Sequence, residues 1–202
     1  MLFEDSDLSR ANFSQAELDR GRLRKCNLTG ANLEEAWLLE CHFDDSVLNH
    51  ANLQLAFITS PQQLDTVRML GTNFNEAIVD VRAITPSQME QAGAINTSSI
   101  VKLGPGEQLE RADLSGLLLH SLVFDGSNLS HADLSECDMT GASLRGCNLS
   151  HANFQFAELE QTDLSGADLT GTVLAGAMLR DCKTDGAIFK DTVMPDGTIH
   201  DS

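Results

Sequence analysis

The sequence predicts an all-β solenoid in which a short, mostly helical and looped insertion separates two stacks of coils. The main observation is that a large apolar residue recurs at every fifth position through most of the 202 residues, with a small residue two places before it. The second observation is compositional, because 42% of the residues are hydrophobic but only 5% are aromatic. Such a composition favours a narrow, repetitive interior over a globular core.

A period of five residues fits neither of the two regular backbone conformations. An α-helix would spread the apolar residues around its circumference, and a β-strand would alternate them between its two faces. The period does fit a square coil in which each five-residue unit forms one side. Large and small residues then both point inward, and the remaining positions face outward.

Residues 1–59 hold the first run of the repeat, and we expect about three coils there. The large positions hold Phe3, Leu8, Phe13, Leu18, Leu23, Leu28, Leu33, Leu38, Phe43, Leu48, Leu53 and Ile58. The small positions hold Ser6, Ala11, Ala16, Gly21, Cys26, Ala31, Ala36, Cys41, Ser46, Ala51 and Ala56. Random sequence would not keep this register over so many successive units.

The second run occupies residues 109–194, and residues 195–202 follow as a tail. One outward phase, two places after the large residue, is rich in glycine: Gly116, Gly126, Gly141, Gly146, Gly166, Gly171, Gly176 and Gly186. Glycine adopts positive φ angles at little steric cost. This phase therefore predicts a turn at the corners of the coil that needs φ > 0, as a type II turn does.

Residues 60–108 interrupt the repeat, and the first part of this insertion predicts a short helix. Ser60-Pro61-Gln62-Gln63 supplies an N-cap, a proline at the first helical position and a glutamine three places after the cap. A helix through Leu70, ended at Gly71, follows from these signals.

The same signals recur later in the insertion at Thr85-Pro86-Ser87-Gln88, and they predict a second helix that ends at about Gly93. Residues 72–84 carry only a partial repeat. We expect a loop over residues 94–106, with a turn at Gly104-Pro105-Gly106.

Several of the units resemble the A(D/N)LXX signature of the pentapeptide repeat family. They are Ala11-Asn12-Phe13, Ala31-Asn32-Leu33, Ala51-Asn52-Leu53, Ala132-Asp133-Leu134, Ala152-Asn153-Phe154 and Ala167-Asp168-Leu169-Thr170-Gly171. The resemblance covers residues 1–59 and 109–194, and it implies a right-handed quadrilateral β-helix with four units, about 20 residues, per coil. The segment 193–200 is similar to the tails of cyanobacterial members, and the likeness to the topoisomerase-binding members is more distant.

The sequence predicts no catalytic, cofactor-binding or metal-binding residues. The five cysteines occupy small inward positions and no two of their numbers differ by 20, so we expect neither a disulfide nor a zinc site. Their use as small buried residues suits a reducing compartment. His131 and His151 do differ by 20 and should stack on one outer corner, without a third ligand. Since no serine or threonine lies in a nucleophile–base arrangement, we expect that the protein is not an enzyme.

The candidate interaction surface consists of large apolar residues in outward phases. Trp37 and Phe57 differ by 20 and should stack on one face, with Leu39 and Leu55 nearby. Either the inserted helices pack over these residues, which we favour, or the patch is a surface that binds a partner or forms a dimer.

A second outward set is expected just after the insertion, at Leu118, Leu119 and Val123. Leu117 and Leu122 are too large for the small position, so this coil should be distorted. Val173 and Val193 differ by 20 near the C-terminal end, which suggests a hydrophobic end suited to a homodimer.

Charge and hydropathy exclude several classes of partner. Thirty acidic against 13 basic residues give a net charge of −17, which argues against direct binding to nucleic acid or to an anionic membrane. No apolar run approaches the length of a membrane span. The first residues lack the order of a signal peptide, so we expect a cytoplasmic protein unless a targeting segment is missing.

The functional expectation is a non-catalytic scaffold that presents flat solenoid faces and the inserted loop to a protein partner of unknown identity. The alternative is an acidic DNA mimic that binds DNA gyrase or topoisomerase IV, as some pentapeptide repeat proteins are held to do. We favour the scaffold, because acidic side chains also keep a protein with exposed ladders in solution. Arg20, Arg22, Arg24 and Lys25 moreover break the acidic surface.

Overall fold

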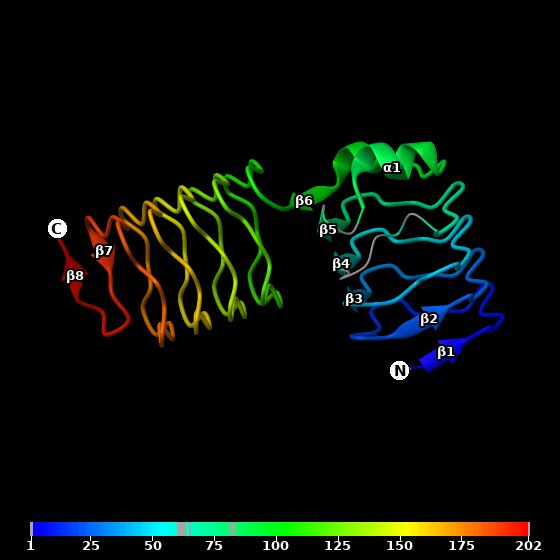
Figure 1. The fold of residues 1–202 in the computed structure, drawn as a ribbon, viewed down its shortest axis with the longest axis horizontal. Helices are drawn as coiled ribbons and strands as arrows, with labels where there is room; N and C mark the ends of the chain where they lie inside the picture. The colour runs from blue at the N-terminus through cyan, green and yellow to red at the C-terminus, as the bar shows by residue number, and fades with distance from the viewer. Residues whose placement is uncertain (1, 60–63, 65, 81, 83, 202) are drawn as a thin grey trace. The chain divides into compact units, whose positions relative to one another are not determined.

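The computed structural model describes residues 2–59, 64, 66–80, 82 and 84–201. The chain divides into two compact units, unit 1 at Met1–Lys102 and unit 2 at Leu103–Ser202. Each unit is a stack of coils in which successive turns of the chain run parallel (Figure 1). The predicted all-β solenoid, a right-handed quadrilateral β-helix, is confirmed.

The corner of a coil is a tight turn of the predicted kind. In unit 2 the Ala132 N–H donates to the Leu129 carbonyl at 3.0 Å, which closes a four-residue turn. The third residue of this turn, His131, has a φ angle of 59°. A bond from the first to the fourth residue with positive φ at the third is the pattern of a type II turn. The glycine-rich phase therefore marks the corners, as the sequence predicted.

Successive coils are joined by parallel β-bridges. In unit 2, Asn128 bridges to Asn148 and Asn148 bridges to Asp168, so each coil consists of four five-residue units. The Leu129 N–H donates to the Asn148 carbonyl at 2.8 Å and the Asn148 N–H to the Ser127 carbonyl at 3.0 Å. These bonds pair the backbone groups of one coil with those of the next, as in any parallel ladder.

Unit 1 contains the longer strands. β1 (Leu2–Glu4) pairs with β2 (Arg22–Arg24), and a second parallel sheet has the order β3-β4-β5-β6. Its strands are β3 (Trp37–Leu39), β4 (Phe57–Thr59), β5 (Ile78–Asp80) and β6 (Val101–Leu103), the last residue of which is the first of unit 2.

The number of residues per coil increases along unit 1. Asn32 bridges to Asn52, Asn52 to Asn73 and Asn73 to Ile95, so the spacing between bridged residues grows by one at each step. The coils thus continue through most of the segment that the sequence analysis treated as an insertion. The extra residues are accommodated between bridges, while the inward residues still return to the core.

The first predicted helix is wrong over its described residues. Arg68 bridges to Val47, residues 66 and 70 lie in turns, and none of the described residues 64 and 66–70 is helical. Val67 and Met69 are buried in the core of unit 1, and this burial outweighs the capping signals. The N-cap motif at residues 60–63 lies outside the described residues.

The second predicted helix is confirmed as α1 (Pro86–Gln91). The Gln88 N–H donates to Thr85 Oγ1 at 3.3 Å, and the Thr85 N–H donates to Gln88 Oε1 at 2.8 Å, which completes a capping box. Met89 is fully buried and anchors the helix to the core. Gly93, with a φ angle of 80°, follows the end of the helix.

The loop predicted over residues 94–106 is wrong in part. It contains the 3₁₀ helix η1 (Thr97–Ser99) and β6, which completes the second sheet. Leu103 is buried, so its side chain contributes to the core. The turn predicted at residues 104–106 is present, with Gly106 at a φ angle of 73°.

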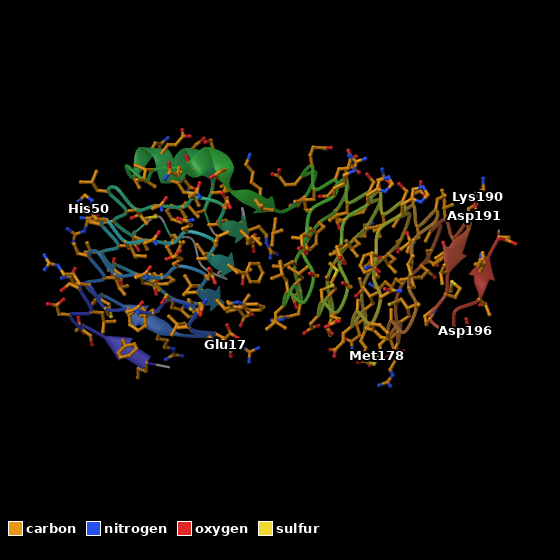
Figure 2. All side chains as sticks on the ribbon, turned by 180° about the vertical axis from the view of Figure 1, so that it is seen from behind. Glu17, His50, Met178, Lys190, Asp191 and Asp196 are labelled. Atoms are coloured by element: carbon orange, nitrogen blue, oxygen red, sulfur yellow. The ribbon has the colours of Figure 1, made fainter. Side chains whose placement is uncertain are left out.

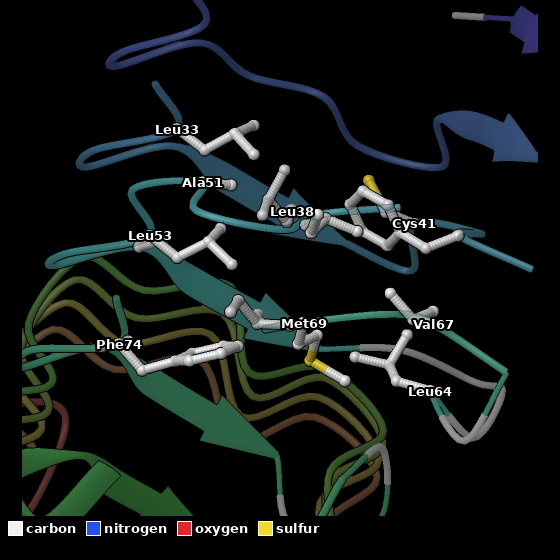
Figure 3. Close-up of a cluster of buried hydrophobic side chains, with 14 of the residues drawn as sticks. Leu33, Leu38, Cys41, Ala51, Leu53, Leu64, Val67, Met69 and Phe74 are labelled. Atoms are coloured by element: carbon white, nitrogen blue, oxygen red, sulfur yellow. The ribbon is translucent and has the colours of Figure 1, made fainter. Parts of the chain in front are cut away.

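Large apolar side chains fill the interior of both units. Figure 3 shows the core of unit 1, where Leu33, Leu53 and Phe74 come from successive coils. In unit 2, Leu134 and Phe154 are fully buried one coil apart. Each such side chain contributes about 1.5–3 kcal/mol through the apolar surface that it removes from water.

The last coil of unit 2 ends in a hairpin. β7 (Thr192–Val193) pairs antiparallel with β8 (Ile199–His200) around a turn in which the Gly197 N–H donates to the Met194 carbonyl at 2.8 Å. The predicted tail therefore adds an antiparallel strand to the ladder. Among the described residues, no helix is long and apolar enough to cross a membrane.

Candidate interaction surface

The inward hydroxyl groups are used as hydrogen-bond donors within the stack. Thr172 Oγ1 donates to the Leu149 carbonyl at 2.7 Å, and Thr162 Oγ1 donates to the Met139 carbonyl at 2.9 Å. Each bond joins a small position to a large position in the preceding coil. Among the described residues, no buried side-chain nitrogen or oxygen lacks a partner. These hydroxyl groups therefore help to join each coil to the one before it.

The five cysteines are free thiols, and they lie in the small positions. Cys41 Sγ donates to the Leu18 carbonyl at 2.7 Å and Cys147 Sγ to the Phe124 carbonyl at 3.0 Å. Burial raises the pKa of the Cys41 thiol to about 12 and that of Cys147 to about 11. Since the thiolate is the reactive form, these groups are inert at neutral pH. In the described part of the chain, no three potential ligands are grouped to hold a metal.

His131 and His151 stack as the sequence predicted, with ring centroids 5.0 Å apart and an angle of 15° between the planes. The ring of His151 also lies over the next corner of the stack. A Cβ atom built on Gly171 would be 2.5 Å from Nδ1 of His151. A glycine at a corner therefore makes room for a ring from the coil before it.

The predicted surface of unit 1 is only partly accessible. Trp37 and Phe57 pair across β3 and β4, and their rings meet edge to face with centroids 6.0 Å apart. Phe57 and Leu39 are buried, Trp37 is half-buried and Leu55 is 41% exposed. Among the described elements, α1 packs against η1 and not against β3 or β4. The expected cover of this patch by inserted helices is therefore not provided by α1.

The expectation that Leu119 faces outward is wrong, because this residue is fully buried. Leu119 falls on the five-residue register that starts at Leu109, so it is a large inward residue. Leu118 is half-buried and bridges to Asp138, at the same phase of the next coil. The turn bond from the Leu117 N–H to the Leu114 carbonyl is 3.4 Å long, no longer than the 3.5 Å bond at Cys137, so the turn bond shows no distortion specific to Leu117.

Many outward carboxylates and carboxamides cap the backbone of their own turn. Asp133 Oδ1 accepts the Ser135 N–H at 3.0 Å and the Ser135 hydroxyl at 2.7 Å, and Asn153 Nδ2 donates to the same oxygen at 3.0 Å. Bonds of this kind, from a serine or threonine two residues on, lower the pKa of Asp7, Asp133, Asp163 and Asp196. Asparagine does the same at Asn52, which accepts the Gln54 N–H at 3.2 Å. Part of the acidity of the chain therefore serves the turns.

The structure also reveals an exposed apolar corner that the sequence analysis missed. Phe156 is 66% exposed and Met178 is 48% exposed, and both lie in unit 2. Figure 2 shows Met178 on the outer surface of this unit. Phe156 stands two places after Phe154, at the corner phase where glycine is common, so counting the phase of each large residue could have identified it.

Solved structures with similar chains include two from cyanobacteria. HetL from Nostoc sp. strain PCC 7120, a pentapeptide repeat protein involved in heterocyst differentiation regulation, is 27% identical over 99% of this chain and 90% of its own, with a TM-score of 0.30. Rfr23 from Cyanothece 51142 is 24% identical over 83% of this chain and 90% of its own, with a TM-score of 0.36.

A more distant similarity is to QnrB1, a plasmid-mediated fluoroquinolone resistance protein. It is 16% identical over 93% of this chain and 89% of its own, with a TM-score of 0.28. No curated protein sequence matches the chain.

The family comparison matches more than half of the chain. The description "Pentapeptide repeats" applies to residues 26–59, 108–146 and 147–183, with eight copies of the repeat. These segments coincide with coils whose corners and bridges are described above. The chain belongs to the pentapeptide repeat family.

Proposed function

We propose that the protein is a non-catalytic scaffold that presents its outer faces to a protein partner. The observation that supports this function is the exposure of large apolar side chains on a hydrogen-bonded ladder. Leu70 and Phe156 are more than half exposed, and Leu55 and Ile188 also reach solvent. Their exposure costs solvation free energy that an inward or polar residue would not, which favours a role in binding.

The ladder gives such side chains fixed positions. Each coil donates to and accepts from its neighbours through bonds such as that from the Leu159 N–H to the Met178 carbonyl, at 2.8 Å. A partner therefore meets a preorganised surface and loses little free energy in ordering it.

The candidate residues of unit 1 contribute unequally to this proposal. Trp37 and Leu55 retain accessible surface, whereas Leu39 and Phe57 do not. The surface of α1 adjoins the irregular coils of the same unit and exposes Ser87, Glu90 and Gln91. We assign to this helix the role of a specificity element.

Affinity capture with the wild-type protein and a Ser87→Ala, Gln91→Ala double variant tests this function. Both substitutions leave the capping box and the Met89 anchor in place, so the variant should fold as the wild type does. We expect saturable capture of a protein partner that untagged wild type displaces, with weaker capture by the variant. The scaffold is rejected if the wild-type bait shows no saturable, displaceable partner. Equal capture by both baits removes only the role of α1.

Mimicry of DNA is the second candidate, and the net charge of −17 favours it. Two observations make it the weaker one. Several aspartates cap turns, and Arg24 lies 3.3 Å from Asp44 and 4.0 Å from Glu4, so that charges alternate along that face. A gyrase supercoiling assay discriminates the two functions, because inhibition at micromolar protein supports mimicry and an unchanged rate rejects it.

A further inference from the structure

The exposed corner of unit 2 carries a residue that the fold does not require there. Phe156 has a φ angle of 59°, in the left-handed region. That conformation costs about 1–2 kcal/mol for an L-residue other than glycine, and asparagine and aspartate tolerate it better. The same corner of the neighbouring coils holds Glu136 and Gly176. Other corners of this chain also hold residues other than glycine in this conformation, such as His131 and His151. Phe156 differs from them because its hydrocarbon ring is 66% exposed, so that most of its apolar surface is open to a partner.

The ring of Phe156 packs on the next coil, over Gly176. A Cβ atom built on Gly176 would lie 2.6 Å from Cδ1 of Phe156, so the ring lies directly over this glycine. The Phe156 N–H also donates to the Ala175 carbonyl at 3.1 Å. Any side chain at Gly176 would displace the ring, whereas glycine lets one face of the ring rest on the coil and leaves the rest to solvent.

A second exposed apolar side chain follows on the next side of the coil. Met178 follows Gly176 by two residues and is 48% exposed. Two successive coils thus expose an aromatic ring and, two residues after the glycine beneath this ring, a flexible thioether, and both side chains suit contact with an apolar side chain.

Acidic groups flank this apolar corner. Glu136 occupies the same corner one coil before Phe156, and Glu158 bridges directly to Met178. Both carboxylates are exposed, and neither forms an ion pair with another described residue. The base Arg180 on this side pairs with Glu160 at 3.4 Å. The corner therefore joins an apolar centre to negative charge that is not neutralised.

We propose that Phe156, Gly176 and Met178 form a docking site for a basic, apolar segment of a partner protein. A large apolar side chain of this segment packs on Phe156 and Met178, and its flanking lysines or arginines reach Glu136 and Glu158. Aromatic residues at the centre of an interface carry much of the binding energy, and charge complementarity selects the partner. This proposal rests on the scaffold function and names the chemistry of its partner.

Charge disfavours the other occupants of this site. A second copy of the chain would bring its own Glu136 and Glu158 against the same carboxylates. An anionic lipid surface would be repelled by the net charge of −17.

The test measures binding of two fluorescein-labelled synthetic peptides of equal length by fluorescence anisotropy. One is an amphipathic leucine–lysine peptide and the other a leucine–glutamate peptide. We expect the wild type to bind the first and not the second. Phe156→Asn should weaken binding at least tenfold, since asparagine keeps the left-handed corner without the ring. Glu136→Gln with Glu158→Gln should weaken binding and reduce its salt dependence.

His151→Asn is the matched control, because the exposed ring of His151 also lies over a glycine, Gly171, at a left-handed corner of unit 2. It should leave the affinity for the leucine–lysine peptide unchanged. The docking site is overturned if Phe156→Asn binds as tightly as the wild type, or if His151→Asn weakens binding equally. It is also overturned if light scattering shows self-association that Phe156→Asn abolishes, or if vesicles with anionic lipids bind through Phe156 and the peptide does not.

Capture experiments separate this proposal from the scaffold function. A natural partner that binds wild type and the Phe156→Asn variant equally overturns the docking site but leaves the scaffold standing. If no natural partner is captured while the leucine–lysine peptide still requires Phe156, the docking chemistry stands and the scaffold fails.

Discussion

The two units build the same coil with different regularity. In unit 2, every bridge between Gln108 and Val193 joins two residues whose numbers differ by 20. In unit 1 this difference grows along the stack, from 20 to 21 and then to 22. Both units nevertheless maintain parallel bridges and a filled interior. The difference shows that the ladder tolerates extra residues between bridges, provided that an apolar side chain returns to the core on each side.

The units also differ in how they treat outward rings. In unit 1, the rings of Trp37 and Phe57 meet edge to face, and Phe57 is buried. In unit 2, Phe156 rests on a glycine and stays largely exposed. The first arrangement removes apolar surface from water and stabilises the fold, while the second leaves that surface available for binding.

Truncation of a central core residue should have the largest effect. Phe154→Ala in unit 2 should lower the free energy of unfolding by about 3–5 kcal/mol, because Phe154 is fully buried. Phe13→Ala in the first coil of unit 1 should cost less than half of that, since Phe13 is half-buried. Guanidinium unfolding followed by circular dichroism measures both.

The single tryptophan, Trp37, lies in unit 1 and reports on that unit alone. Phe154→Ala should therefore shift the transition seen by circular dichroism more than the transition seen by Trp37 fluorescence. This prediction assumes that the two units unfold separately. Equal shifts of the two transitions would contradict it and would show that the two units unfold together in one cooperative transition.

A substitution at Gly176, on which the ring of Phe156 packs, should have the next largest effect. Gly176→Ala and Gly116→Ala both place a side chain at a positive φ angle, at a cost of about 1 kcal/mol each. Gly176→Ala should cost more, because its Cβ meets Phe156, whereas a Cβ on Gly116 meets nothing within 4 Å. Thermal unfolding of the purified variants measures the difference.

A double-mutant cycle isolates the contact between ring and glycine. In a Phe156→Asn background the extra cost of Gly176→Ala should disappear, leaving the cost seen at Gly116. An extra cost that persists without the ring would mean that Gly176 is needed for another reason.

Acid should destabilise unit 2 before unit 1. The turn bonds hold the pKa of Asp133 and Asp163 below the ordinary value, so they add stability above the pKa of the unfolded chain. That stability is lost as the pH falls through the folded pKa values. Most of the described residues of unit 1 that cap a turn in this way are asparagines, which do not titrate: Asn12, Asn27, Asn32, Asn52 and Asn73.

The measurement is an acid titration from pH 7 to pH 2 by circular dichroism and by Trp37 fluorescence. As the pH falls, the circular dichroism signal should change before the Trp37 fluorescence does. The double variant Asp133→Asn, Asp163→Asn should bring the midpoints of these two transitions closer together in pH. An interval that the double variant leaves unchanged would contradict the assignment of acid sensitivity to these carboxylates.

Filling a small void in unit 1 should have the smallest effect. A cavity of about 20 Å³ is lined by apolar residues that include Leu64, Val67, Met69 and Phe74, at the irregular coils. Val67→Ile should stabilise unit 1 by about 0.5 kcal/mol if the added methyl group enters this space. Guanidinium unfolding followed by Trp37 fluorescence measures it, and a loss of stability would show that the void cannot take a methyl group.

The candidate site could be predicted only in part from the sequence. A coil of four five-residue units placed Trp37 over Phe57 and His131 over His151, because parallel coils of equal length superimpose equal phases. The same reasoning would have found Phe156, whose corner phase is visible in the sequence. It could not show that Gly176 seats the ring or that Phe57 is buried, since both depend on side-chain packing between coils.

The sequence by itself determined the coil, its four sides, its inward and outward positions and the capped helix α1. Each follows from a local rule: a period of five, a glycine phase or a capping box. Only the tertiary structure decided that residues 66–70 extend the ladder instead of forming a helix, and that β6 completes a sheet. There, burial of Val67, Met69 and Leu103 outweighs local signals, because the free energy of filling the core exceeds that of a helix cap.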